Sequence, residues 1–191
     1  MKEIAKLLVV LTGVCVVAGL ILSFVNEATT DARAYQDRLE MLNALNMVLP
    51  EHDNEPDKDI MDVSGVSYYV SRVKGSINGI AFITSTEKGY GGLIKIIVGV
   101  KPCGEIIGIG ILQQKETPGL GAKIEGARFR DQYKGKTLAG VKWSVKKDGG
   151  DFDQISGATI SPRAVTAAVK DGLEKFSVNK AKILGGTDVN Q

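Results

Sequence analysis

The sequence has few of the residues that build inorganic redox centres. It contains two cysteines and one histidine in 191 residues. No Cys-x-x-Cys pair indicates a zinc, iron–sulfur or haem site. Cys15 lies in an apolar N-terminal run far from Cys103, so we expect no disulfide, and His52 follows a proline in a charged segment typical of a solvated loop. If the protein carries electrons, an organic cofactor has to hold them.

Excess charge of one sign is also missing. The chain has 24 basic and 22 acidic residues, a net charge of +2. Basic residues gather only around Lys142, Lys146 and Lys147, which makes a nucleic-acid partner unexpected. The length is sufficient for one membrane segment and one domain with an ordinary core.

One long uncharged run extends from Leu7 to Val25. Its length of about 19 residues suits a transmembrane helix. The run is longer than the apolar part of a usual signal peptide, and no small-x-small cleavage site follows it. Lys2 and Lys6 precede the run, which predicts a cytoplasmic N-terminus and an extracytoplasmic domain.

A second helix is predicted from Ala28 to Leu49, because apolar residues recur there at steps of three and four. Its apolar side packs either on its own domain or on a partner subunit, and the former is the commoner arrangement. Pro50 ends the helix, and residues 51–59 form a charged linker.

The middle of the chain carries strand patterns. Runs of β-branched and aromatic residues separated by short glycine- or proline-containing turns predict an antiparallel meander. Gly108 and Gly110 lie two apart and leave one side of their strand bare, so that either a helix or a flat ring can approach it. The predicted strands cover residues 66–70, 79–84, 93–100 and 105–112.

Less regular segments follow the meander. A turn over residues 116–121 leads to a predicted helix from Ala122 to Tyr133, and then to a short strand within 136–147 whose lone Trp143 we expect in the core. Ser161 and Pro162 predict a helix start with Ser161 as the N-cap, and apolar spacing continues to Phe176. The tail from residue 177 to 191 has no periodicity and predicts an irregular end.

Two motifs in these irregular segments resemble a known family. Residues 153–159 read Asp-x-x-Ser-Gly-Ala-Thr, and residues 116–121 read Glu-Thr-Pro-Gly-Leu-Gly. The first resembles the sequence at which ApbE-type flavin transferases attach FMN, and the second resembles another hallmark of the same FMN-binding domain. With the apolar N-terminal segment, the chain resembles the RnfG family of the Rnf electron-transport complex, a relative of NqrC in the sodium-pumping NADH:quinone reductase.

The resemblance implies a site. FMN would be joined through its phosphate to Thr159, and Asp153 would be a recognition or loop-fixing residue. Lys123 is our own addition, a cation near enough in sequence to assist a negatively charged flavin. The remaining implied residues form the loop around the attachment point and the turn beside the flavin ring: Ser156, Gly157, Ala158, Glu116, Thr117, Gly119, Leu120 and Gly121.

The expected architecture is an α+β protein with one N-terminal transmembrane helix followed by an FMN-binding domain of antiparallel sheet and packed helices. We expect a membrane anchor at 1–26, a helix and linker at 27–59, the FMN-binding domain at 60–178 and a tail at 179–191. The implied localisation is the inner cell membrane, with a single pass through it.

The implied function is an electron relay between ferredoxin and NAD within a complex that transports sodium ions or protons. The implied partners are the other Rnf subunits and the flavin transferase, and no turnover is expected of the chain alone. Two alternatives remain open: a free-standing membrane flavoprotein reductase, and a non-redox anchored module that binds a free anion.

Overall fold

The computed structural model of the chain describes residues 2–185, which divide between residues 41 and 42 into two compact units. Helix α1, Lys2–Val48, forms all of the first unit that is described and ends in the second. The two predicted N-terminal helices are therefore one unbroken helix. Its stretch Val10–Thr30 is long and apolar enough to cross a membrane and overlaps the predicted span.

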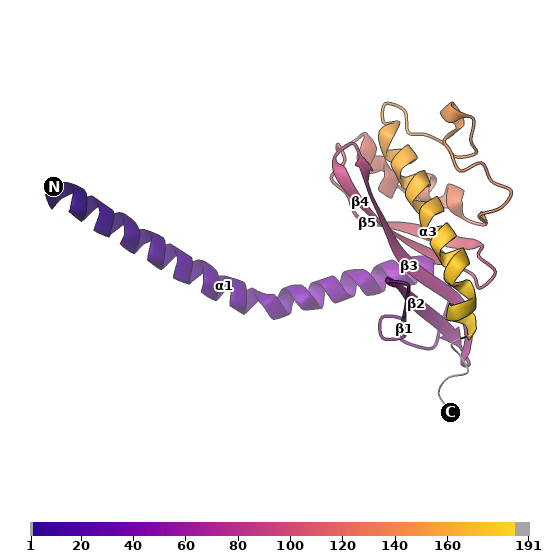
Figure 1. The fold of residues 1–191 in the computed structure, drawn as a ribbon, viewed down its shortest axis with the longest axis horizontal. Helices are drawn as coiled ribbons and strands as arrows, with labels where there is room; N and C mark the ends of the chain where they lie inside the picture. The colour runs from indigo at the N-terminus through magenta and orange to yellow at the C-terminus, as the bar shows by residue number, and fades with distance from the viewer. Residues whose placement is uncertain (1, 186–191) are drawn as a thin grey trace. The chain divides into compact units, whose positions relative to one another are not determined.

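The second unit is built on a five-stranded antiparallel sheet with the strand order β1-β2-β3-β4-β5 (Figure 1). The predicted meander is confirmed, while β1 was not predicted because it is short and half-exposed. The strands are β1 (Ile60–Val63), β2 (Val66–Val73), β3 (Ser76–Gly89), β4 (Gly92–Val100) and β5 (Ile106–Gln113).

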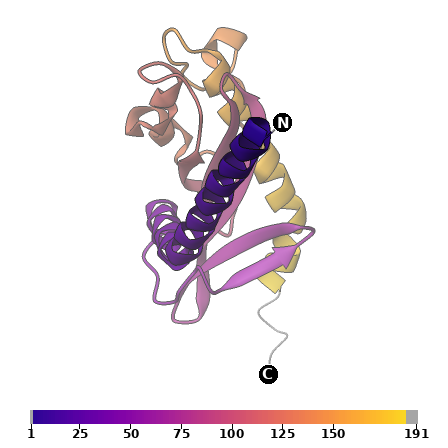
Figure 2. The same cartoon turned by 90° about the vertical axis from the view of Figure 1, so that its left-hand side faces the viewer.

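Helix α3, Ile160–Gly185, runs along one face of this sheet (Figures 1 and 2). Phe176 stacks on Phe82 of β3 with ring centroids 6.0 Å apart, and both rings are buried. Gly172 lets the helix lie close, since a Cβ there would come within 2.6 Å of the Phe82 ring. The long core between α3 and the sheet fixes where the N-terminal end of α3 lies.

The last turn of α1 covers the opposite face of the sheet. An added Cβ at Gly99 would lie 1.9 Å from the carbonyl oxygen of Val48, and one at Gly108 would lie 3.6 Å from that of Met47. The bare glycine side therefore receives a helix end and not a ring. The end of the predicted helix packs on its own domain, because Leu45 and Val48 are fully buried.

The helix predicted from Ala122 to Tyr133 is wrong. The structure has three short pieces, because Gly126 adopts an extended conformation (φ −69°, ψ 142°) and its N–H closes a turn on the carbonyl of Lys123. An extended residue cannot continue an α-helix. The pieces are the 3-10 helices η1 (Gly121–Glu125) and η2 (Asp131–Tyr133) and the single α-turn α2 (Ala127–Arg130).

Two further predictions are wrong. Residues 136–147 form loops and the start of η3 (Lys146–Asp148), and Val145 makes only an isolated bridge with Phe152. The predicted irregular tail is helical up to Gly185, because Asn179 and Ile183 are buried on the core. The predicted domain boundary at residue 178 thus falls inside α3, and residues 186–191 lie outside the described residues.

We predict that Gly99→Ala lowers the stability of the chain far more than Gly108→Ala does. The two glycines are cross-strand partners, but only at Gly99 would a Cβ overlap the backbone of Val48. Overpacking of this kind costs about 1–3 kcal/mol. Urea unfolding of the detergent-solubilised chain measures the difference, and equal losses in the two variants would contradict the close packing of α1 on Gly99.

Candidate functional site

The two sequence motifs meet at one pocket with a volume of 370 Å³. Three segments distant in sequence form its walls: the turn between β3 and β4, the turn that begins at Glu116, and the loop that enters α3. The lining residues are Tyr90, Glu116, Thr117, Leu120, Gly121, Gly157, Ala158, Thr159, Ile160 and Ser161.

Glu116 joins these three segments. The residue is 5 % exposed. Its Oε1 accepts a hydrogen bond from the backbone N–H of Gly91 (3.0 Å), and its Oε2 accepts one from the Ser161 hydroxyl (2.5 Å). A buried carboxylate is costly unless such donors surround it. The Glu116 side chain therefore joins the β3–β4 turn and the first turn of α3 to the turn at residues 116–121.

The glycines beside Glu116 make room for its carboxylate and for the backbone of its turn. A Cβ on Gly121 would lie 2.6 Å from Oε2 of Glu116 and 2.7 Å from the Ser161 hydroxyl. A Cβ on Gly91 would lie 1.8 Å from the carbonyl oxygen of Lys115. Gly121 was expected in the turn beside the flavin ring, and in the structure the space next to it is filled by Glu116 and Ser161.

The predicted capping role of Ser161 is wrong. Helix α3 begins at Ile160, so Ser161 lies inside the first turn and its hydroxyl is used by Glu116. Pro162 is tolerated there because the N–H groups of a first turn have no partner within the helix. Thr159 is the last residue before the helix.

The three hydroxyl groups of the loop have different surroundings. Ser156 is exposed, Thr159 is half-buried and Ser161 is buried. Among the described residues, no group forms a hydrogen bond with the Thr159 hydroxyl. Thr159 also lines a second pocket of 520 Å³ with Lys146 and Lys147, so its side chain stands at the border of two pockets.

The loop backbone is held in a tight turn. The N–H of Ala158 donates to the carbonyl of Ile155 (3.0 Å), and Gly157 adopts a left-handed conformation with φ +80°. A side chain is disfavoured at that φ. Leu120 lies next to Gly157, since a Cβ on this glycine would be 3.2 Å from its Cδ2. The two motifs are thus in direct contact.

Asp153 and Lys123 lie apart from the pocket at Glu116. Both line a neighbouring groove of 610 Å³, together with Arg128 and Lys146. The Asp153 carboxylate forms an ion pair with Lys146 (2.7 Å), and its backbone N–H donates to the Gln132 side chain (2.5 Å). Gly119 has a left-handed φ of +77° and does not line the pocket at Glu116.

A buried aromatic cluster supports the loop from behind. Phe152 stacks on Tyr133 with centroids 4.6 Å apart, and the Tyr133 hydroxyl lies 2.8 Å from that of Thr166 on α3. Burial raises the pKa of Tyr133 far above its usual range, although the hydrogen bond with Thr166 opposes this. Trp143, which was expected in the core, is half-buried and packs against the core at Phe152.

An ion pair fixes the other side of the loop. Both Asp148 oxygens accept hydrogen bonds from Arg163 in the first turn of α3, at 2.5 and 2.6 Å. The hydrogen bond from Arg163 lowers the pKa of Asp148, so this carboxylate stays ionised. The chain between η3 and α3 is therefore tied down at both ends.

Tyr90 is a lining residue that the sequence motifs missed. Its side chain is 71 % exposed at the tip of the β3–β4 turn. The Gly-Tyr-Gly-Gly run at 89–92 predicts a turn. It does not predict that this turn lines the same pocket as Thr159. The contact of Glu116 with Gly91 places Tyr90 beside the pocket.

No cluster of three metal-binding side chains occurs in residues 2–185. The FMN-binding domain family matches residues 89–174, a range that includes both motifs and Tyr90. RnfG, the corresponding protein in the ion-translocating oxidoreductase complex of Shewanella baltica, is 39 % identical, over 83 % of this chain and 82 % of its own. The chain belongs to the RnfG family.

Other relatives agree with the assignment to the RnfG family. The RnfG proteins of Cereibacter sphaeroides (strain ATCC 17023) and Aliivibrio fischeri (strain ES114) are both 38 % identical, over 88 % and 91 % of this chain and 82 % and 90 % of theirs. The fold resembles that of NqrC from Shewanella oneidensis, with a TM-score of 0.54, 24 % identity and 70 % of each chain covered.

We predict that Glu116→Ala destabilises the domain whereas Glu116→Gln largely preserves it. Alanine leaves the buried Ser161 hydroxyl without a partner, at about 1–3 kcal/mol, and also removes the acceptor of the Gly91 N–H. Glutamine can accept from Gly91 and donate to Ser161, so its loss stays within about 1 kcal/mol. Denaturant unfolding distinguishes the two, and an alanine variant as stable as the glutamine variant would contradict the joining role of Glu116.

Proposed function

We propose that the chain is a membrane-anchored electron-relay subunit of an ion-translocating oxidoreductase complex and carries FMN linked through its phosphate to Thr159. The observation that carries this proposal is the meeting of the two motifs at one pocket, with the Thr159 hydroxyl at its border. Membership of the RnfG family supports the same function.

The residues present fit FMN. A pocket volume of 370 Å³ falls within the range of about 300–1,000 Å³ common for small-molecule sites. The lining includes Tyr90 and Leu120, two exposed apolar side chains that a flat ring system would cover. We propose that these two contact the ring, and that Glu116, Thr117, Gly119 and Gly121 form the turn that supports it.

The phosphate end would lie among positive charges. A phosphodiester on Thr159 carries one negative charge and would sit at the N-terminal end of α3, whose free N–H groups favour an anion. Lys146 and Lys147 line the adjoining pocket. Ser156, Gly157 and Ala158 shape the turn before the attachment residue.

Asp153 and Lys123 have supporting roles in this proposal. Asp153 fixes the loop through its ion pair with Lys146 and is not a ring contact, because a carboxylate beside the ring would oppose the uptake of electrons. Lys123 lies in the groove on the far side of the loop. We propose that its charge acts on the flavin from there, without direct contact.

Bound FMN would supply the capacity to accept and donate electrons. The protein holds the phosphate in place and sets what surrounds the ring. We propose that the electrons pass between ferredoxin and NAD through neighbouring subunits, coupled to sodium or proton transport, and that an ApbE-type transferase attaches the FMN.

We predict that Thr159→Ala abolishes flavin attachment while the chain still folds and inserts into the membrane. The half-buried hydroxyl makes no hydrogen bond with a described residue, so its loss removes the acceptor and little stability. A denaturing gel should show no flavin fluorescence for this variant. A fluorescent Thr159→Ala band would identify another residue as the attachment point.

The other two loop hydroxyls provide matched controls. Ser156→Ala and Ser161→Ala should both keep the fluorescent band. Ser161→Ala should also lower the free energy of unfolding by about 1–3 kcal/mol, because it removes a donor from the buried carboxylate of Glu116. Loss of the band in Ser156→Ala alone would move the attachment point to Ser156.

We also propose that the flavin domain lies outside the cytoplasm, since Lys2 and Lys6 precede the apolar stretch of α1. Cys15 and Cys103 are both free, as predicted, and Cys103 is exposed. A membrane-impermeant maleimide added to intact spheroplasts should label the chain, and Cys103→Ser should remove the label. Labelling of Cys103 only after lysis would reverse the orientation.

A further inference from the structure

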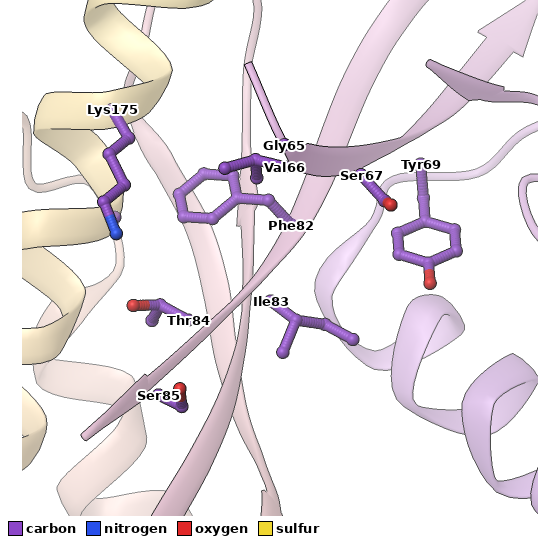
Figure 3. Close-up of a pocket in the computed structure, with 10 residues that line it drawn as sticks. Gly65, Val66, Ser67, Tyr69, Phe82, Ile83, Thr84, Ser85 and Lys175 are labelled. Atoms are coloured by element: carbon purple, nitrogen blue, oxygen red, sulfur yellow. The ribbon is translucent and has the colours of Figure 1, made fainter. Parts of the chain in front are cut away.

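The sheet opens into a notch at the side away from β5. Strands β2 and β3 are paired from Val73 and Ser76 only as far as Tyr68 and Phe82. Beyond this point Val66 and Ser67 stay paired with β1, and the two strands diverge. The space between them, with a volume of 340 Å³, is lined by residues of both strands and of α3 (Figure 3).

One wall of the notch is an open strand edge. Residues 83–86 of β3 pair with residues 94–97 of β4 on one side and with no described residue on the other. Alternate residues of such an edge present backbone N–H and C=O groups that have no partner in the sheet. The notch therefore offers main-chain hydrogen bonds beside residues Ile83–Ser85.

The remaining walls are held firmly. Asn179 of α3 is buried and bonds both the Ser64 hydroxyl (3.1 Å), at the β1–β2 turn, and the Tyr68 hydroxyl (3.0 Å). Thr84 donates to the carbonyl of Ala168 on α3 (3.1 Å). These contacts fix the two diverging strands to the same helix, so the notch is built into the fold.

The charged side chain that lines the notch is basic, and the Asp62 carboxylate just outside the lining accepts a hydrogen bond from Ser67 (2.5 Å). Lys175 is the one charged side chain among the lining residues, and it extends from α3 toward Thr84 (Figure 3). Within the described part of the chain it has no ion-pair or hydrogen-bond partner. A ligand that occupies the notch is best matched if it carries a negative charge next to Lys175.

We propose that the notch receives an extended, acidic segment of another subunit of the complex, which adds a strand to the open edge of β3. The proposal rests on the proposed membership of such a complex. Strand addition uses main-chain hydrogen bonds for affinity and side-chain pockets for specificity, and this edge supplies both. The pairing of β3 with β4 is irregular between Thr86 and Gly89. This irregularity and Lys88 would obstruct an incoming strand, but both lie beyond Thr86 at the end of β3.

A second copy of this chain fits the notch less well. The open edge of β3 runs beside Lys175, an exposed residue of α3. A symmetric edge-to-edge pair would bring the Lys175 side chains of the two copies into one interface, where like charges repel. A partner with the opposite charge avoids this repulsion.

The experiment places a photoreactive phenylalanine derivative at Ser85 in the full chain, expressed in a host that makes the complex. Ser76 is the matched control, because it is an exposed serine of the same strand outside the notch. Irradiation should cross-link the Ser85 position to another subunit with a yield about tenfold above that of Ser76.

Charge reversal tests the partner's chemistry. Lys175→Glu should lower the Ser85 cross-link several-fold, whereas Lys182→Glu, an exposed lysine of the same helix outside the notch, should leave it unchanged. A cross-link to a second copy of this chain, equal yields at Ser85 and Ser76, or indifference to Lys175→Glu would each overturn the proposal.

The flavin band on a denaturing gel separates this test from that of the proposed function. If the chain carries flavin and co-purifies with other subunits but Ser85 does not cross-link to them, only the notch proposal fails. If the chain carries no flavin or co-purifies with no other subunit, the proposed function fails as well.

Discussion

The candidate site depends on the hydrogen bonds of the buried Glu116 carboxylate. This one side chain receives donors from the β3–β4 turn and from the first turn of α3, two segments that lie about 70 residues apart in the sequence. Gly121 and Gly91 have no room for a side chain. A Cβ on Gly121 would overlap the Glu116 carboxylate, and one on Gly91 would overlap the backbone of Lys115. Both walls of the pocket take their positions from this arrangement.

The loop that carries Thr159 is fixed independently of Glu116. Phe152 holds its start in the aromatic cluster, and Arg163 holds the start of α3 to Asp148. These contacts hold the loop in place, so its conformation does not depend on a hydrogen bond from the Thr159 hydroxyl. On the other side of the domain, α3 and the β1–β2 turn leave an open strand edge, so the same helix supports the proposed cofactor site and the proposed docking site.

Much of the fold could be predicted from the sequence, because the strand residues are β-branched and their turns contain glycine. The Asp-x-x-Ser-Gly-Ala-Thr and Glu-Thr-Pro-Gly-Leu-Gly motifs also identified the segments that form the pocket. The predictions that were wrong or missing concern residues whose positions depend on tertiary contacts. A serine before a proline suggests an N-cap, yet Ser161 bonds a glutamate 45 residues away, and Tyr90 reaches the pocket only because Glu116 holds its neighbour. The tail is helical because Asn179 and Ile183 find partners in the core.

The most direct test of the account is to locate the flavin on the chain purified from its own host. Trypsin should release residues 148–163, a peptide that contains Ser156, Thr159 and Ser161. Tandem mass spectrometry should find this peptide heavier by one FMN minus one water, with the added mass on Thr159. An unmodified peptide, or FMN on either serine, would contradict the account.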